Sequence, residues 1–215
     1  MKNVPRIFID APLGVGKTFE LTPDQHHYLT RVMRTERFLA LGGGTEYEAE
    51  IINNSQFIIH NSTPRADPSG KWTFCFAPIK KIEDLVSGVV QCGAGVLAPV
   101  ITERTAARHV NWERMKKIII ENAEQSGRNS IPELREPVSF AELDKCGLVY
   151  GDERKAGAAR EIAAPASVLF VGPEGGFSDA EFDALDAAGA VGVGLGRTIL
   201  RAEVAAVALC ARCAP

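Results

Sequence analysis

The spacing of hydrophobic and polar positions changes near residue 70 of this chain. Before that point come four short runs rich in apolar residues, at residues 6–9, 38–41, 47–52 and 56–60, and polar residues alternate with apolar ones most clearly at 47–51. Alternation with a period of two predicts strands with one buried face, and the close spacing of the runs favours a small β-barrel or sheet. One helix is expected to interrupt them through residues 26–32, with Thr22 as its N-cap and Pro23 in its first turn.

A segment rich in proline, serine and glycine, residues 61–70, follows these runs and predicts a linker. Beyond it, the expected strands are residues 72–78, 95–100, 148–150, 168–171 and 191–195. The expected helices are residues 81–92, 111–126, 139–145, 179–188 and 201–213. Alternation of strands and helices predicts an α/β fold with a parallel sheet. We therefore expect two domains, a β-barrel at residues 1–68 and an α/β domain at residues 69–215.

Two of the expected strands end in segments that carry glycine and lead into a helix. The first is Gly172-Pro-Glu-Gly-Gly176, and Ser178 then begins a Ser-x-x-Glu capping box. The second is Leu195-Gly196, followed by Leu200-Arg-Ala-Glu203. Glycine permits positive φ and lets a ligand approach the backbone closely. One such segment is an ordinary strand–turn–helix, but two of them predict a pocket with backbone walls for a flat cofactor ring.

The sequence of these two segments resembles the ribosomal small-subunit methyltransferase E family, within the SPOUT class of trefoil-knotted RNA methyltransferases. The similarity also covers residues 27–34, 99–104 and 121–133, so it extends along nearly the whole chain. It implies a PUA-like β-barrel that binds RNA, followed by a knotted methyltransferase domain. It also implies methyl transfer from S-adenosylmethionine (SAM) to N3 of a uridine in 16S rRNA of the 30S subunit. The family further implies a homodimer, and the chemistry requires no metal.

The chemistry of methyl transfer, together with the resemblance, suggests roles for single residues around the expected pocket. Arg201, and after it Arg128, are candidates for stabilising the charge that spreads onto the uracil oxygens during transfer. Glu203 is expected to hold Arg201, and Glu124 is the one candidate for a general base. An arginine at a helix end, such as Arg128, is also common simply because it complements the helix dipole. The residues expected to form the walls of the SAM pocket are Gly172, Pro173, Glu174, Gly175, Gly176, Leu195, Gly196, Ile199 and Leu200.

Three arginines recur at intervals of three residues after the first helix: Arg31, Arg34 and Arg37. They are candidates for neutralising RNA phosphates, and the alternative is a solvated charged face.

Two departures from the family pattern bear on substrate affinity. The helix before Gly93 reads Ser-Gly-Val-Val-Gln-Cys, and Val204 stands where a threonine is usual. A glycine inside that helix weakens it by roughly 1 kcal/mol.

A second motif supports a different function. Ala11-Pro-Leu-Gly-Val-Gly-Lys-Thr18 satisfies a relaxed P-loop pattern, and the acidic pair Asp152-Glu153 imitates the strand end that would hold magnesium. A P-loop must run directly into a helix, and Pro23 would break the first turns of that helix. Nucleotide hydrolysis is therefore the second hypothesis, and a non-catalytic RNA-binding module is the third. Binding of SAM discriminates among them.

Composition limits the function only loosely. The net charge of −3 gives little general affinity for a phosphate backbone, although the middle third of the chain is net basic. Five scattered cysteines argue against a disulfide framework. No apolar run approaches the length of a membrane span, and the first residues lack the pattern of a signal peptide. We therefore expect a cytoplasmic protein.

Overall fold

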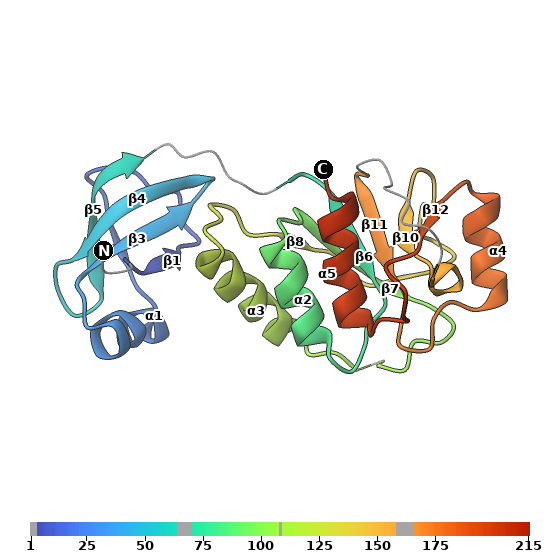
Figure 1. Cartoon of the computed structure of the whole chain (residues 1–215). Coiled ribbons are helices and arrows are strands. Elements are labelled where there is room, and N and C mark those ends of the chain that lie inside the picture. Colours follow the sequence, from blue (N-terminus) through green and yellow to red (C-terminus); the bar gives the residue numbers. More distant parts are fainter. Residues whose placement is uncertain (1–3, 64–69, 108, 158–165) are drawn as a thin grey trace. The chain divides into compact units, whose positions relative to one another are not determined.

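The computed structural model describes residues 4–63, 70–107, 109–157 and 166–215. The chain forms two compact units (Figure 1). The N-terminal unit comprises residues 1–68 together with residues 123–131, and the C-terminal unit comprises residues 69–122 and 132–215. Residues 123–131 thus pack with the N-terminal unit, although they lie far beyond the expected linker in the sequence.

The N-terminal unit is a curled half-barrel of five strands in the order β1-β3-β4-β5-β2. Strand β1 runs parallel to β3, and the other neighbours are antiparallel. Its core includes the fully buried side chains of Leu29, Phe38 and Phe57. The four strands predicted here are confirmed, and β2 was not predicted. The strands are β1 (Arg6–Phe8), β2 (Thr18–Glu20), β3 (Arg37–Gly42), β4 (Thr45–Ile51) and β5 (Gln56–Thr63).

The predicted helix in this unit begins as expected. Helix α1 (Pro23–His27) has Thr22 as its N-cap, and Thr22 and Gln25 form a capping box. The chain continues as a π-helical segment, η1 (Tyr28–Met33), and ends at Arg34, whose φ of 52° is left-handed.

Residues 11–18 do not form a P-loop, as the position of Pro23 predicted, because Thr18 begins a strand and no helix follows Lys17 directly. Strand β2 pairs antiparallel with β5, with Phe19 opposite Phe57. The glycines before it form a turn in which Lys17 N donates to Gly14 O at 3.2 Å. A helix N-terminus that could face phosphates is therefore missing from this segment, and the main support for nucleotide hydrolysis is lost.

The C-terminal unit is built on a parallel sheet in the order β12-β10-β11-β6-β7-β8, and β9 also pairs with β7. Helices α2 and α5 lie side by side in front of the sheet (Figure 1). The strands are β6 (Thr73–Phe76), β7 (Val96–Ile101), β8 (Glu133–Leu134), β9 (Val138–Ser139), β10 (Val149–Gly151), β11 (Val168–Val171) and β12 (Val191–Val193). The helices are α2 (Ile82–Gln91), α3 (Trp112–Gln125), α4 (Asp179–Ala187) and α5 (Ala202–Cys213). Alternation of strands and helices therefore predicted the architecture correctly.

The helix expected at residues 139–145 is absent. Ser139 ends β9, and turns and bends follow it. Ser139 and Glu142 have the spacing of a capping box, and the Glu142 carboxylate accepts hydrogen bonds from Ser139 N and Oγ. The Lys145 ammonium then closes the segment by donating to the carbonyls of Phe140 and Leu143. The cap is present, but side-chain contacts replace the helix that it normally begins.

Gly88 has a packing role that the sequence did not reveal. A Cβ atom at this position would lie 2.6 Å from a methyl group of Val207 on α5. The glycine therefore permits close contact between α2 and α5. On α5, Cys210 and Cys213 are buried. The hydrogen bond with Cys92 and then burial raise the pKa of the Cys210 thiol, and burial raises the pKa of the Cys213 thiol. No helix in the described part of the chain is long and apolar enough to cross a membrane.

Candidate functional site

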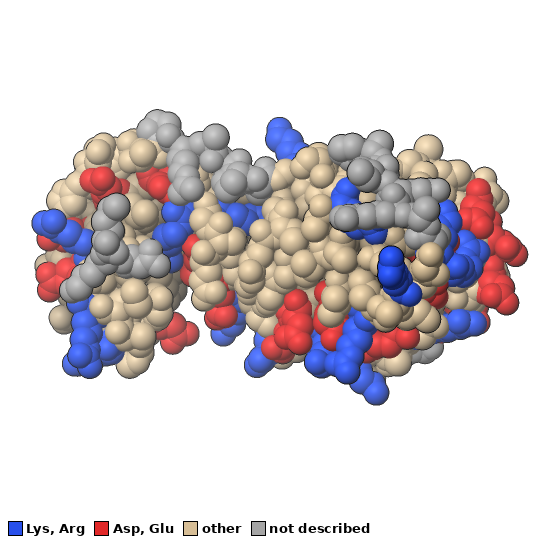
Figure 2. Space-filling view, in the orientation of Figure 1, with Lys and Arg blue, Asp and Glu red and all other residues tan. Residues whose placement is uncertain are grey.

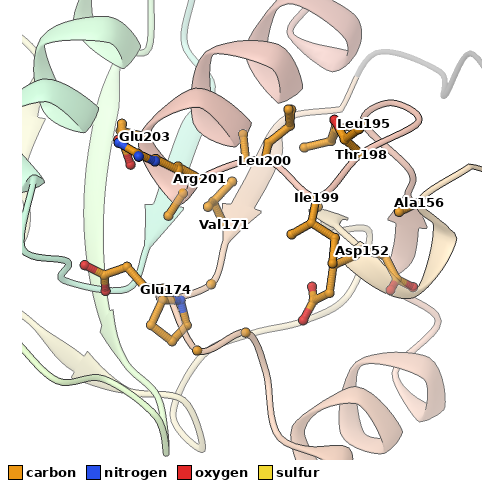
Figure 3. Close-up of a pocket in the computed structure, with 18 of the residues that line it drawn as sticks. Asp152, Ala156, Val171, Glu174, Leu195, Thr198, Ile199, Leu200, Arg201 and Glu203 are labelled. Carbon is orange, nitrogen blue, oxygen red and sulfur yellow. The ribbon is translucent and has the colours of Figure 1, made fainter.

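A cavity of about 670 Å³ opens in the C-terminal unit. Its lining residues follow the carboxyl ends of β12, β10, β11 and β6, which are consecutive neighbours in the sheet (Figure 3). The carboxyl edge is the usual place for ligands in an open parallel sheet. The volume is within the range of small-molecule sites.

Residues 172–176, which we call the first wall, all line the cavity. Gly172 and Pro173 are buried, and a Cβ atom on Gly172 would lie 3.1 Å from the ring of Phe177. Gly176 has a φ of +69°, so this backbone conformation strains any residue other than glycine. Positive φ therefore requires glycine at 176, and close contact with Phe177 favours glycine at 172.

Three interactions brace the first wall. Arg104 NH1 donates to the carbonyls of Gly175 and Phe177, each at 3.1 Å. Lys80 N donates to Glu174 Oε1 at 2.8 Å. Ser178 and Glu181 form the predicted capping box of α4 directly after the wall. The backbone of this loop is therefore held from three directions.

Residues 194–200, which we call the second wall, are far more exposed. Leu195, Ile199 and Leu200 line the cavity, and the side chain of Ile199 lies in it (Figure 3) although that residue is 75% exposed. Gly196 was expected in the wall but does not line the cavity. Its carbonyl instead accepts a hydrogen bond from Gly157 N at 3.0 Å. Thr198 lines the cavity and was not predicted.

Arg201 lies where the second wall enters α5, and it lines the cavity. It is the N-cap of α5, but its side chain makes no capping hydrogen bond and is exposed. The expected contact between Glu203 and Arg201 is replaced by an ion pair of Glu203 with Lys81, 3.8 Å long. Figure 3 shows Arg201, Glu203 and Glu174 on one side of the cavity and Asp152 on the other.

The end of β10 contributes residues that sequence reasoning assigned to the wrong function. Gly151, Asp152 and Glu153 line the cavity. Their acidic pair after a strand was noticed, but as part of the nucleotide-binding hypothesis. Lys80 and Lys81, which follow β6 at a distance of a few residues, were missed entirely. The signal that would have found both sets is their place after strands at the carboxyl edge of the sheet.

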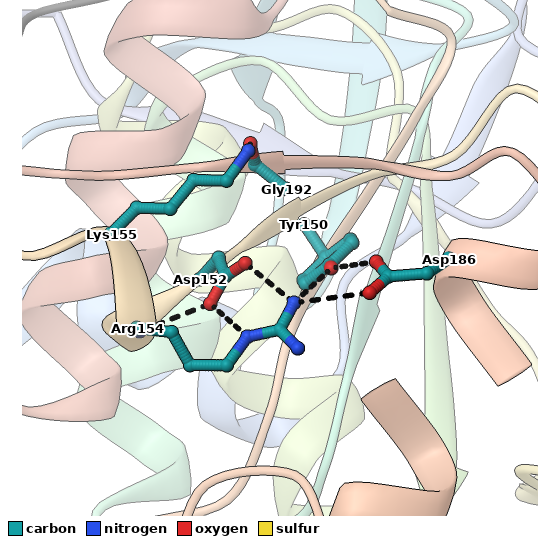
Figure 4. A network of polar contacts seen from close by, with 6 residues as sticks. All are labelled: Tyr150, Asp152, Arg154, Lys155, Asp186 and Gly192. Atoms are coloured by element: carbon teal, nitrogen blue, oxygen red, sulfur yellow. Dashed lines mark hydrogen bonds and ion pairs between the residues drawn. The ribbon is translucent and has the colours of Figure 1, made fainter. Parts of the chain in front are cut away.

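A polar network supports the β10 side of the cavity (Figure 4). The Asp152 side chain is fully buried, and Arg154 donates to its two oxygens at 2.9 and 2.8 Å. Arg154 NH2 also donates to Tyr150 Oη, which in turn donates to Asp186 at 2.9 Å. Burial and the bond to Asp186 raise the pKa of Tyr150 above its ordinary value, and the bond to Asp152 raises the pKa of Arg154. The phenol and the guanidinium both keep their protons at neutral pH.

Arg128 and Glu124 belong to the N-terminal unit and do not line the cavity. Arg128 is buried, and its carbonyl accepts a hydrogen bond from Arg6 NH2 at 2.9 Å. Glu124 Oε1 accepts from Phe8 N at 2.7 Å. These contacts join the end of α3 to β1 within the N-terminal unit. The catalytic roles of both residues stay predictions.

The three arginines expected to contact RNA are all exposed, but they do not share one element. Arg31 lies in η1, Arg34 is the left-handed residue after it, and Arg37 begins β3. The Arg37 Nε atom is 3.7 Å from Glu50, a long and exposed ion pair. Their role in RNA binding stays a prediction.

The kinds of groups that line the cavity match the chemical groups of SAM. The second wall and Val171 supply apolar side chains, and the first wall supplies backbone, as an adenine ring requires. Charged groups of both signs, including Glu153 and Arg201, lie at the polar sides of the cavity. In the part of the chain that the structure describes, no cluster of three or more His, Cys, Asp or Glu residues could hold a metal ion.

Comparison with known proteins defines the class. Residues 66–214 match the model of the RNA methyltransferase domain family. The small subunit methyltransferase E of ribosomal RNA from Rickettsia conorii is 30% identical over 94% of this chain and 91% of its own length. The same enzyme from Bacillus subtilis is 28% identical over 87% of this chain and 86% of its own length. The chain therefore belongs to the ribosomal RNA small subunit methyltransferase E family.

Solved structures agree with this membership. The methyltransferase E of Neisseria gonorrhoeae, crystallised with S-adenosyl methionine, superposes with a TM-score of 0.82. It is 26% identical and covers 97% of this chain and 96% of its own. A methyltransferase of Legionella pneumophila in complex with SAM gives the same values. The predicted α/β fold, a half-barrel followed by a SPOUT-like parallel-sheet domain, is confirmed, and the trefoil knot stays a prediction.

Proposed function

We propose that this protein is a SAM-dependent methyltransferase that modifies N3 of a uridine in 16S rRNA of the 30S subunit. The observation that carries the proposal is the cavity between the two walls at the carboxyl edge of the sheet. Family membership supports the reaction, and the solved relatives that contain SAM support the cofactor. The preference for uridine N3 comes from the family resemblance.

The residues that would hold SAM are the backbone of the first wall, from Gly172 to Gly176, and the apolar side chains of Leu195, Ile199 and Leu200. Bound there, SAM supplies a methyl group on a sulfonium sulfur that departs as a neutral thioether. The first wall fixes the site, because Arg104 and the glycine geometry leave its backbone little freedom. Bound SAM would cover apolar surface of the second wall, such as the exposed side chain of Ile199.

Arg201 is the residue that we assign to charge stabilisation. Uracil N3 becomes a nucleophile only after it loses its proton, and negative charge then spreads onto the two carbonyl oxygens. A fixed cationic donor in a cavity that excludes water lowers the energy of that charge. Arg201 lines the cavity and makes no capping bond in α5, so its guanidinium is available for this task. Arg128 and Glu124 are the remaining candidates for a second cation and for a base.

Calorimetry tests the cofactor. The purified protein is expected to bind SAM or its demethylated product, S-adenosylhomocysteine, and to show no magnesium-dependent affinity for ATP. ATP binding that Lys17→Ala abolishes would contradict the proposal and restore the nucleotide hypothesis. A protein that binds 30S subunits but neither SAM nor its product would be a non-catalytic RNA-binding module.

We also propose a homodimer. Val204 and Val207 are 49% and 39% exposed on α5, and Ile199 is exposed just before it. Figure 2 shows largely uncharged surface over α2 and the neighbouring part of α5. A surface with few charges and with exposed apolar side chains is typical of a protein–protein interface. Sedimentation is expected to give a dimer, and a species near the chain mass of 23.1 kDa at micromolar concentration would contradict it.

The substrate is expected to be the assembled 30S subunit. A net charge of −3 gives weak general affinity for RNA, so recognition depends on the shape of a folded particle. The exposed Arg31, Arg34 and Arg37 are the candidates for its phosphate contacts. We expect assembled 30S subunits to be methylated much faster than free 16S rRNA, and equal rates at moderate salt would contradict this.

Because its substrate is the ribosomal subunit, the enzyme is expected in the cytoplasm.

A further inference from the structure

The carboxylates that line the cavity differ in how their charge is compensated. Those of Asp152, Glu174 and Glu203 each have a partner: Arg154, the backbone N–H of Lys80, and Lys81. Glu153 is different, because no described residue forms a hydrogen bond or ion pair with its carboxylate. In the described part of the cavity, Glu153 is therefore the carboxylate whose charge is left to a ligand.

The position of Glu153 directs this charge toward the first wall. It begins the 3-10 turn η2 (Glu153–Lys155) directly after β10, and it lines the cavity. A Cβ atom on Gly176 would collide with Glu153 Oε1. The carboxylate thus lies against the backbone of the first wall, at the glycine whose left-handed conformation leaves room for it.

The turn that carries Glu153 is held firmly on both sides. Before it, the buried Asp152 caps the turn by accepting from Arg154 N at 3.0 Å. After it, Lys155 Nζ donates to Gly192 O on β12 at 2.7 Å. The Arg154 guanidinium also stacks over the ring of Phe182 at 3.7 Å. Figure 4 shows Asp152 and Arg154 joined in one network with Tyr150 and Asp186, and Lys155 beside Gly192. The turn therefore positions Glu153 before a ligand arrives.

The neighbouring cations Arg154 and Lys155 form no hydrogen bond or ion pair with the Glu153 carboxylate. Arg154 is paired with Asp152, and the Lys155 ammonium is bound to a carbonyl of β12. Arg201, in contrast, lies on the opposite side of the cavity from Asp152 (Figure 3). The cavity therefore has an acidic side at the end of β10, and on its other side Arg201 lies with the carboxylates of Glu174 and Glu203, which already have partners.

We propose that Glu153 recognises the positive charge of the cofactor. This inference rests on the proposed function. SAM carries positive charge on its sulfonium and ammonium groups and negative charge on its carboxylate, whereas its adenine and ribose are uncharged. A carboxylate held at the acidic side of the cavity favours such a cation over an uncharged adenosine derivative. Glu153 therefore contributes selectivity between charged and neutral ligands, and the apolar second wall contributes affinity for both.

Calorimetry with three ligands tests the proposal. SAM carries both positive charges, on its sulfonium and its ammonium group. S-adenosylhomocysteine keeps only the ammonium of these two, and 5′-methylthioadenosine is neutral but keeps adenine and ribose. Glu153→Gln preserves size and is expected to lower SAM affinity about tenfold, with methylthioadenosine affinity within about twofold of wild type. An equal loss for SAM and S-adenosylhomocysteine identifies the ammonium as the recognised group, and a larger loss for SAM identifies the sulfonium.

Two variants control for folding and for net charge. Glu153→Asp keeps the charge with a shorter reach and is expected to recover part of the SAM affinity. Asp183→Asn removes an exposed carboxylate on α4, outside the cavity, and is expected to leave all three affinities unchanged. Failure of the wild type to bind SAM would overturn the proposed function together with this inference. If the wild type binds SAM but Glu153→Gln weakens all three ligands equally, or none of them, Glu153 does not recognise charge and this inference alone fails.

Discussion

In the first wall of the cavity, Gly172 and Pro173 are buried and Arg104 holds the carbonyls of Gly175 and Phe177. In the second wall, residues 196–199 are exposed, and Ile199 presents its side chain to the cavity. One wall is fixed by its own unit, and the other has apolar surface that a ligand would cover. The comparison indicates different roles for the two walls. The first wall sets the position of the cofactor, and the second wall supplies apolar contacts and leads into Arg201, the cation assigned to charge stabilisation.

The largest expected effect comes from Arg201, at the end of the second wall. Removal of a donor that stabilises charge only during transfer lowers the rate by about 10²–10³-fold. Arg201→Ala is therefore expected to bind SAM almost normally, to remain folded, and to methylate 30S subunits very slowly at saturation. Single-turnover kinetics measures the rate and calorimetry measures the affinity.

Arg201→Lys and Arg34→Ala sharpen this prediction. Lysine restores a charge but not a planar fork of donors, so Arg201→Lys is expected to recover little of the rate. Arg34→Ala, in the N-terminal unit, is expected to weaken 30S binding and to leave the saturated rate nearly intact. If Arg201→Ala instead loses SAM affinity and keeps its maximal rate, Arg201 is a cofactor-binding residue and the assigned role is wrong.

Matched glycine substitutions compare the rigidity of the two walls. Gly176→Ala forces alanine into a left-handed conformation and against Glu153, which is expected to cost about 2 kcal/mol of unfolding free energy. A Cβ atom on Gly196 meets no atom within 4 Å, so Gly196→Ala is expected to change stability by less than about 0.5 kcal/mol. Denaturant unfolding measures both. Equal losses in the two variants would remove the distinction between the walls.

Loss of the brace on the first wall is expected to have a moderate effect. Arg104→Met keeps the length of the side chain but removes its two hydrogen bonds to the Gly175 and Phe177 carbonyls. SAM affinity is expected to fall about fivefold, because the wall loses its fixed position. Arg197→Met, an exposed arginine of the second wall, is the control and is expected to leave SAM affinity unchanged. If both variants bind SAM with the affinity of the wild type, the two hydrogen bonds of Arg104 do not contribute to SAM binding.

The smallest expected effect is at Ile199. Because this side chain is 75% exposed, Ile199→Ala is expected to leave the unfolding midpoint unchanged. Its apolar area is covered when a ligand binds, so SAM affinity is expected to fall about threefold. Calorimetry and thermal unfolding on the same preparation separate the two effects. A clear loss of stability would mean that the second wall already packs as tightly as the first.

Local sequence patterns predicted most of the fold. Alternation of strands and helices predicted the parallel sheet, and the N-cap at Thr22 and the capping box at Ser178 marked the starts of α1 and α4 correctly. The helix expected after Ser139 does not form although Glu142 caps Ser139, because a side-chain cap needs helix-forming contacts beyond it. The P-loop pattern failed at Lys17, since its glycines form a turn between strands.

The cavity was predicted less completely than the fold. Glycine-rich walls are visible in the sequence because their backbone geometry demands particular residues. Asp152, Glu153, Lys80 and Lys81 line the cavity only because four strands lie side by side, and the strand order is a property of tertiary structure. The packing of residues 123–131 with the N-terminal unit is likewise set by long-range contacts, such as those of Arg6 with Arg128 and Asn129.

The central claim is that the cavity between the two walls serves methylation of 16S rRNA. The most direct test is mass spectrometry of the nucleosides of 16S rRNA from a strain that lacks this gene. N3-methyluridine is expected to disappear on deletion, to return when the wild-type gene is restored, and to remain absent with Arg201→Ala. An unchanged N3-methyluridine content in the deletion strain would contradict the account.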